Sequence, residues 1–242
     1  MLTDNERQQL LAEINAVLAE RNLKPLPKLG DHSKGEFEIV RIKEIYDHSK
    51  RFFTDVKFTV LLPSGDPGEF TVRFNANGLS SDGAVFVTLV NGKFAIVKQW
   101  RPSLGRWMYE VPRGFGEKLD NARIAGQLGT IGIGDLPLGT LVRELGEEVM
   151  AGAKVTSLTH LANIAQDSGT HSATPSYFLV MLQVPEAKLS KGLKGSDDEV
   201  AKVKLWDTET VRAEIGQRLC DNHTITALCL ALNHIQNLPR LA

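Results

Sequence analysis

Three glutamates lie close together in the segment 143–148, which reads Arg-Glu-Leu-Gly-Glu-Glu. If this segment is helical, Glu144, Glu147 and Glu148 share one face, because residues three and four apart are neighbours on a helix. Like charges packed this closely repel one another and weaken a bare helix. Clustered carboxylate oxygens are the ligands that Mg²⁺ requires. The segment therefore predicts a divalent metal site, and the alternative is an acidic helix face exposed to solvent.

Further motifs flank this segment in the order found in a known family. Residues 99–102 read Gln-Trp-Arg-Pro, residues 110–114 read Glu-Val-Pro-Arg-Gly, and residues 216–224 follow with an Asp-Asn-His-Thr end. Together with the acidic segment, they resemble the Nudix box and its flanking motifs in the ADP-ribose pyrophosphatase branch of the Nudix hydrolases, over about 83–231. The resemblance implies Mg²⁺-dependent hydrolysis of a nucleoside diphosphate linked to a sugar-like group. ADP-ribose is the first expectation, with AMP and ribose 5-phosphate as products.

The resemblance also implies which residues hold the metal. Glu144 and Glu148 would be the main Mg²⁺ ligands, with Glu147 close enough to share or bridge, and the backbone carbonyl of Arg113 would complete the shell. Mn²⁺ is the alternative ion. Pyrophosphate hydrolysis needs charge neutralised on the phosphoryl oxygens, a positioned water and a stabilised leaving group, and metal ions supply most of this. The three glutamates are therefore the expected catalytic residues.

The expected substrate-binding residues are Arg101, Trp100, Glu110 and Arg143. The planar guanidinium of Arg101 suits phosphate oxygens, although a structural ion pair is the alternative. Trp100 could stack on an adenine or belong to the core. Glu110 could hydrogen-bond a substrate ribose or base, or pair with Arg101 or Arg106. Arg143 orients a neighbouring glutamate by an ion pair, with direct phosphate contact as the alternative.

A general base is expected on the loop before the last strand, where residues 196–199 read Ser-Asp-Asp-Glu. A carboxylate on a mobile loop can swing to a metal-bound water. Glu199 is the single residue that we predict for this role. Two alternatives stay open: the run is a polar turn before a strand, or the metal-bound water is acidic enough to need no separate base.

Several departures from the family pattern motivate a second hypothesis from another functional class. About fifteen extra residues are looped between Gly114 and Asp135. Asp135 stands where the box has glutamate, Met150 stands where it has glycine, and residues 166–172 lack the acidic run of that branch. The chain could therefore be a Nudix-fold module that senses a nucleotide sugar without cleaving it. Retention of all three box glutamates favours hydrolysis, since sensing alone needs no metal cluster.

The residues around the motifs predict a chain rich in strands. The tight dipeptide Asn91-Gly92 predicts a hairpin between two of them. β-Branched and aromatic residues predict strands at 37–46, 52–62, 69–74, 84–90, 94–100, 108–111, 156–164, 177–184 and 200–206.

Three helical segments complete the prediction. Thr3 and Glu6 form a capping box for a helix to about Asn22, the acidic helix begins at about Pro137, and residues 208–235 are mainly helical with a break near 221–222. This order predicts an α+β protein. With the resemblance, we expect a Nudix-type α/β/α sandwich with a mixed sheet, preceded by a smaller N-terminal β-rich domain.

The expected domains are an N-terminal helix and linker over 1–30, a β-rich domain over 31–80 and a hydrolase domain over 81–242. The resemblance implies that the β-rich domain forms a homodimer. The formal net charge of -1 gives no argument for nucleic acid or a membrane surface, so we expect neither as a partner, and a small nucleoside diphosphate as substrate. The two cysteines and the absence of a signal pattern or membrane-length apolar run fit the cytoplasm.

Overall fold

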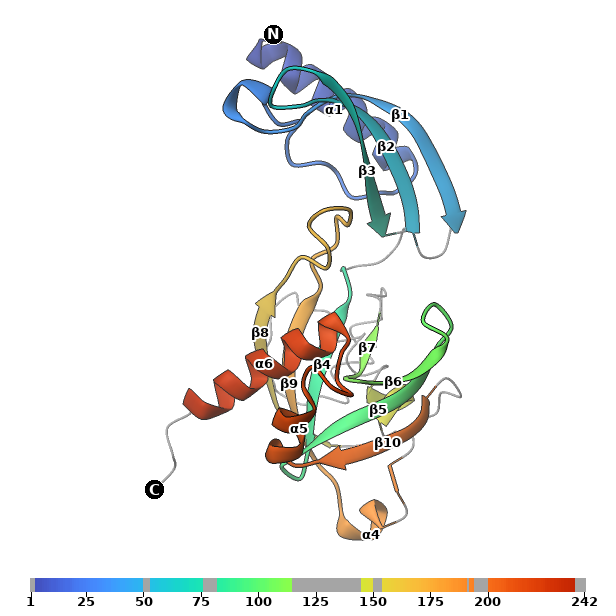
Figure 1. Ribbon diagram of the computed structural model, residues 1–242, viewed down its shortest axis with the longest axis vertical. Helices are drawn as coiled ribbons and strands as arrows, with labels where there is room; N and C mark the ends of the chain where they lie inside the picture. The colour runs from blue at the N-terminus through green and yellow to red at the C-terminus, as the bar shows by residue number, and fades with distance from the viewer. Residues whose placement is uncertain are drawn as a thin grey trace. The chain divides into compact units, whose positions relative to one another are not determined.

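The computed structural model describes residues 3–49, 53–75, 82–114, 145–149, 154–190, 192–193 and 200–237. The chain divides into two compact units (Figure 1). The first comprises Met1–Leu79 and Ala165–Ala173, and the second comprises Ser80–Ile164 and Thr174–Ala242. None of the helices in the described ranges is long and apolar enough to cross a membrane.

The first unit packs one helix against a three-stranded antiparallel sheet. Helix α1 covers Asp4–Glu20, and the strands are β1 (Glu38–Ser49), β2 (Phe53–Leu61) and β3 (Pro67–Asn75). Alternate residues of β2 are buried, and they meet the apolar stripe of α1 at Ile14 and Leu18. The capping box of Thr3 and Glu6 is confirmed. The helix and the β-rich segment thus share one hydrophobic core.

A loop from later in the chain also belongs to the first unit. The Arg73 N–H donates to the Thr170 carbonyl at 2.7 Å, and the Ser172 N–H donates to the Arg73 carbonyl at 3.0 Å. These bonds pair residues 170–172 with the edge of β3, where an isolated bridge joins Arg73 and His171. The loop therefore extends the sheet by backbone pairing.

The second unit is built on a seven-stranded mixed sheet. Its spatial order is β10-β5-β4-β9-β8, with β6 paired to β5 and β7 paired to β4. β4 and β9 run parallel, whereas the other pairs are antiparallel. The strands are β4 (Ala84–Val90), β5 (Lys93–Arg101), β6 (Arg106–Glu110), β7 (Arg113–Gly114), β8 (Lys154–Asn163), β9 (Ser176–Gln183) and β10 (Val200–Trp206).

Helical segments cover both faces of this sheet. Helices α5 (Thr208–Glu214) and α6 (Asn222–Asn237) pack on one face, with Val85, Val87 and Phe94 in the core beneath them. The turn η2 (Leu145–Val149) and the short helix α4 (Glu186–Leu189) pack on the other face. Every residue of β4 is buried, as expected for a strand covered on both sides. The predicted α+β class with a mixed sheet is confirmed.

The elements differ from their predicted forms in two places. The described part of the predicted acidic helix is a π-helical turn, Leu145–Val149, instead of a regular α-helix. Glycine propensity at 146 and repulsion between neighbouring acids both disfavour a regular α-turn there. The C-terminal helical segment separates into α5 and α6 across residues 215–221, a wider break than predicted.

The predicted hairpin at Asn91-Gly92 is confirmed. Its two strands pair only next to the turn. Asn91 and Gly92 have φ values of 49° and 80°, as a tight turn between twisted strands requires. β4 and β5 pair only at Leu89↔Phe94 and Val90↔Lys93, and then separate. β5 continues against β6 and β10, whereas β4 takes β7 as its neighbour. This separation brings β6 and β7 beside β5 and β4.

Candidate active site

A buried glutamate, Glu110, is the last residue of β6 and lies between two arginines. Arg101 Nε donates to Glu110 Oε1 at 2.9 Å, and its Nη2 contacts Oε2 of the same carboxylate. Arg113 Nη2 donates to Glu110 Oε2 at 3.0 Å. The Glu110 side chain is only 1% exposed, whereas both arginines keep about a quarter of their side-chain surface. Two guanidinium groups therefore compensate the buried charge.

The same network reaches the start of α6. Arg113 Nη1 donates to both oxygens of Asp221, at 3.1 and 3.2 Å. The backbone N–H and the hydroxyl of Thr224 donate to Asp221 Oδ2 at 2.9 and 3.0 Å, and the Val111 N–H donates to Thr224 Oγ1 at 3.2 Å. Burial alone would raise the pKa of Asp221, but Arg113 and Thr224 together hold that pKa below its usual range. These bonds join the motif at 110–114 to the motif at 216–224.

Strand alternation decides which candidate residues share a face of the sheet. Successive side chains of a strand point to opposite faces. Gln99 and Arg101 therefore lie on the face of Val97, which belongs to the core that Leu145 and Val149 complete. Arg101 thus shares a face of β5 with the π-helical turn of the acidic segment. Trp100 lies on the opposite face.

The acidic segment contributes Leu145 and Val149 to the core beneath that face. Both are buried, so the backbone of the turn is fixed against the sheet between them. The structure describes the backbone of Glu147 and Glu148 and not their side chains. Three further predicted positions, Glu144, Arg143 and Glu199, lie outside the described residues, as do Asp135 and Met150.

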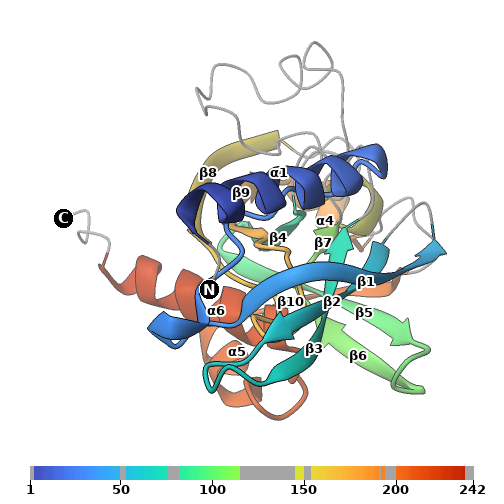
Figure 2. The same cartoon turned by 90° about the horizontal axis from the view of Figure 1, so that it is seen from above.

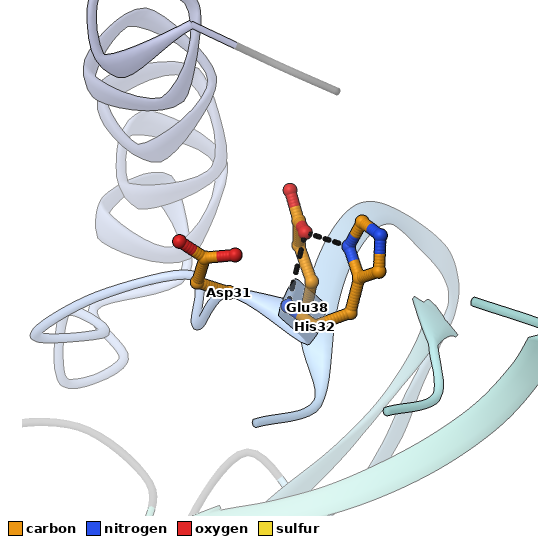
Figure 3. A group of neighbouring side chains, drawn as sticks. All are labelled: Asp31, His32 and Glu38. Atoms are coloured by element: carbon orange, nitrogen blue, oxygen red, sulfur yellow. Dashed lines mark hydrogen bonds and ion pairs between the residues drawn. The ribbon is translucent and has the colours of Figure 1, made fainter. Parts of the chain in front are cut away.

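A second group of titratable residues, in the first unit, was not predicted from the sequence (Figure 3). Asp31, His32 and Glu38 have potential ligand atoms within 4.8 Å of one another. Arg7 donates to Asp31 at 2.9 Å and to Glu38 at 3.3 Å, and the His32 ring contacts Glu38. The carboxylates are thus already paired with cationic or donor groups, and they tie α1 to the start of β1. We therefore interpret Asp31, His32 and Glu38, together with Arg7, as a structural ion-pair network.

The comparisons with known proteins identify the fold. No family model matches the chain, and no curated protein sequence matches it. One similar solved structure is described as an ADP compounds hydrolase, at 15% sequence identity and a TM-score of 0.55. The match covers 85% of this chain and 94% of that chain. At this identity the likeness shows a shared fold, so the chain has the mixed α+β fold of a known hydrolase.

Most of the described site was visible in the sequence as motifs, but the links between the motifs were not. The pairing of Arg113 with Asp221 joins residues that are 108 positions apart. Asp221 belongs to a helix-entry motif, and its spacing to Thr224 is typical of a helix cap. Its second contact, with an arginine, follows only from the fold.

Proposed function

We propose that this protein is a Mg²⁺-dependent hydrolase that cleaves the pyrophosphate of a nucleoside diphosphate linked to a sugar-like group. ADP-ribose is the first candidate, and Mn²⁺ is an alternative ion. One observation carries most of the proposal: the turn within the acidic segment packs on the same face of β5 as Arg101. The fold shared with a hydrolase of ADP compounds supports it.

The proposed metal ligands are Glu144, Glu147, Glu148 and the backbone carbonyl of Arg113. This donor set consists only of oxygen atoms, which fits Mg²⁺. When bound, the metal would neutralise charge on the phosphate oxygens and acidify a bound water. The hydrogen bonds from the Arg113 side chain to Glu110 and Asp221 hold this residue at the strand end, which supports its proposed backbone role.

We propose that Arg101 contacts a phosphate group of the substrate. Glu110 orients the Arg101 guanidinium through the ion pair described above. Because Glu110 is buried, we assign it this positioning role in preference to direct contact with a ribose. Arg143 would orient a box glutamate and Glu199 would act as general base, as expected from the resemblance. Trp100 is left out of this site because it lies on the other face of β5.

A substrate panel tests the proposed function. The protein is incubated with Mg²⁺ and a series of nucleoside diphosphate compounds, and the products are identified by mass spectrometry. We expect a nucleoside monophosphate, and no reaction after a metal chelator is added. Glu148→Gln should lower kcat/KM by about 100-fold or more, because it removes a ligand of the charge-neutralising metal.

Glu186→Gln is the matched control, because Glu186 is an exposed glutamate of the same unit on α4. It should leave turnover unchanged. The proposal is wrong if no compound is cleaved with either ion and Glu148→Gln behaves as wild type. Tight binding of a nucleotide sugar without Mg²⁺ and without cleavage would instead support the sensor hypothesis.

We also propose that the protein is a homodimer, as the resemblance implies for the N-terminal β-rich segment. Sedimentation at micromolar concentration tests this. A single monomeric species would contradict it.

A further inference from the structure

One face of the second sheet carries exposed aromatic rings next to lysines. In the order β6, β5 and β10, residues directly opposite one another project from the same face. Trp107 lies opposite Trp100, Tyr109 lies opposite Lys98, and Lys98 lies opposite Lys202 on its other side. The six residues of this aromatic–lysine face are Lys98, Trp100, Trp107, Tyr109, Lys202 and Lys204.

Both tryptophans are exposed despite their size. Trp100 is 44% exposed and Trp107 is 47% exposed, and their rings meet edge to face at 5.6 Å. The turn end of the β5–β6 hairpin extends beyond α5 and α6, which pack over β5 and over β4, β8 and β9 respectively (Figures 1 and 2). A contiguous exposed apolar patch with a polar rim is typical of an interaction surface, whereas a single exposed ring is not. Both rings therefore keep surface that is accessible to a ligand.

The lysines make the same face positive. Lys98 lies over the Trp107 ring at 4.8 Å, and Lys204 donates to the Tyr109 hydroxyl at 3.2 Å. The hydrogen bond from Lys204, with the charges of Lys204, Lys98 and Arg218, lowers the pKa of Tyr109 although burial opposes it. Within the described residues, none of Lys98, Lys202 and Lys204 has a carboxylate partner. Among the residues that the structure describes, this face therefore carries more cations than carboxylates, although the whole chain has a net charge of -1.

We propose that this aromatic–lysine face binds single-stranded nucleic acid. Bases stack on exposed aromatic rings whatever their sequence, and a neighbouring row of cations neutralises the phosphates. The alternation of the pleat places the two rows side by side on one face of the sheet. An acidic peptide would use the lysines but would leave the tryptophans without a role, and a duplex would not present its bases to them. The proposal is independent of the proposed hydrolase function, because the face lies opposite Arg101.

Fluorescence anisotropy with a labelled oligo(dT) or oligo(U) of about 12 nucleotides tests the proposal. We expect saturable binding in about 50 mM salt, with log K falling against log salt at a slope of about -2 for three phosphate contacts. Trp107→Ala should weaken binding about 5-fold or more, because it removes a stacking surface. Lys202→Ala should reduce the slope by about 0.7.

Two control variants remove the same kinds of side chain outside the aromatic–lysine face. Phe37→Ala removes an exposed aromatic side chain of the first unit, and Lys188→Ala removes an exposed lysine of α4. Neither should change binding, and Trp107→Phe should retain most of it if Trp107→Ala fails to fold. The proposal is overturned if no oligonucleotide binds. It is also overturned if the controls weaken binding as much as the test variants, or if polyglutamate or a duplex of equal length competes as well as the single strand.

Discussion

A single buried carboxylate organises the described part of the candidate site. Glu110 accepts hydrogen bonds from Arg101 and Arg113, and Arg113 also donates to Asp221. Each partner compensates a charge that burial would otherwise make costly. The sequence motifs contain most of these residues, and strand alternation determines which of them share a face. That rule alone separates Trp100 from Arg101, because adjacent strand residues point to opposite faces.

Asp221 pairs with Arg113 and also caps α6, and a substitution can measure the contribution of the ion pair apart from that of the cap. Asp221→Asn keeps a capping side chain but removes the charge, so we expect a loss of about 1–3 kcal/mol of unfolding free energy. Urea unfolding measures it. Asp207→Asn is the control, because Asp207 caps α5 through Thr210 and asparagine caps equally well. Equal losses in both variants would contradict a special role for the arginine contact.

His171 makes the first unit sensitive to acid. Burial and the nearby Arg73 lower the pKa of His171, with Asp167 and Asp55 opposing them. The folded state therefore binds fewer protons than the unfolded state, so stability is full above the ordinary pKa of about 6.5 and is lost as pH falls from there through the lower pKa of the folded state. We expect His171→Gln to lose less thermal stability than wild type between about pH 7.5 and pH 5. An equal loss in both proteins would exclude this group as the cause.

At the scale of elements, periodicity identified the strands because β-branched and aromatic residues alternate with polar ones. The very short β7 was not predicted, since two residues carry no periodicity. The π-helical turn was not predicted either, because five residues are too few for apolar spacing to distinguish π from α hydrogen bonding.

Asn91 has two roles in the β4–β5 turn: its backbone adopts a positive φ, and its side chain bonds to Val184. Asn91 adopts a positive φ, its Nδ2 donates to the Val184 carbonyl at 2.8 Å, and its Oδ1 accepts from the Val184 N–H at 2.9 Å. Asn91→Ala should cost about 2 kcal/mol, because it loses both bonds and strains the backbone. Asn91→Gly should cost about half as much, since glycine relieves the strain. Denaturant titration compares them, and equal costs would show that the backbone term is negligible.

At the scale of the molecule, the predicted domains over 1–30, 31–80 and 81–242 do not include the placement of residues 165–173 in the first unit. That assignment depends on backbone pairing with β3, and backbone groups are the same in every residue. The α+β class followed from the order of the predicted helices and strands. The placement of a loop between β8 and β9 does not follow from any such pattern.

A fragment of residues 80–242 tests the discontinuous unit. It keeps the loop but lacks β3, so the Ser172 amide should lose the protection from hydrogen exchange that its bond to Arg73 gives. The Ser176 amide, which donates to the Gly83 carbonyl within the second unit, should stay protected. Protection of Ser172 in the fragment would show that the loop is ordered without its partner strand.

The return of this loop also has a consequence for inheritance. The first unit is encoded by two separate stretches of the gene, so it cannot be gained, lost or exchanged as one cassette. A recombination break near codon 80 would pair the strands of one parent with the loop of another. Only parents whose loop and β3 edge have compatible backbone geometry would yield a folded product. The two stretches should therefore be inherited together, although most of the second unit is encoded between them.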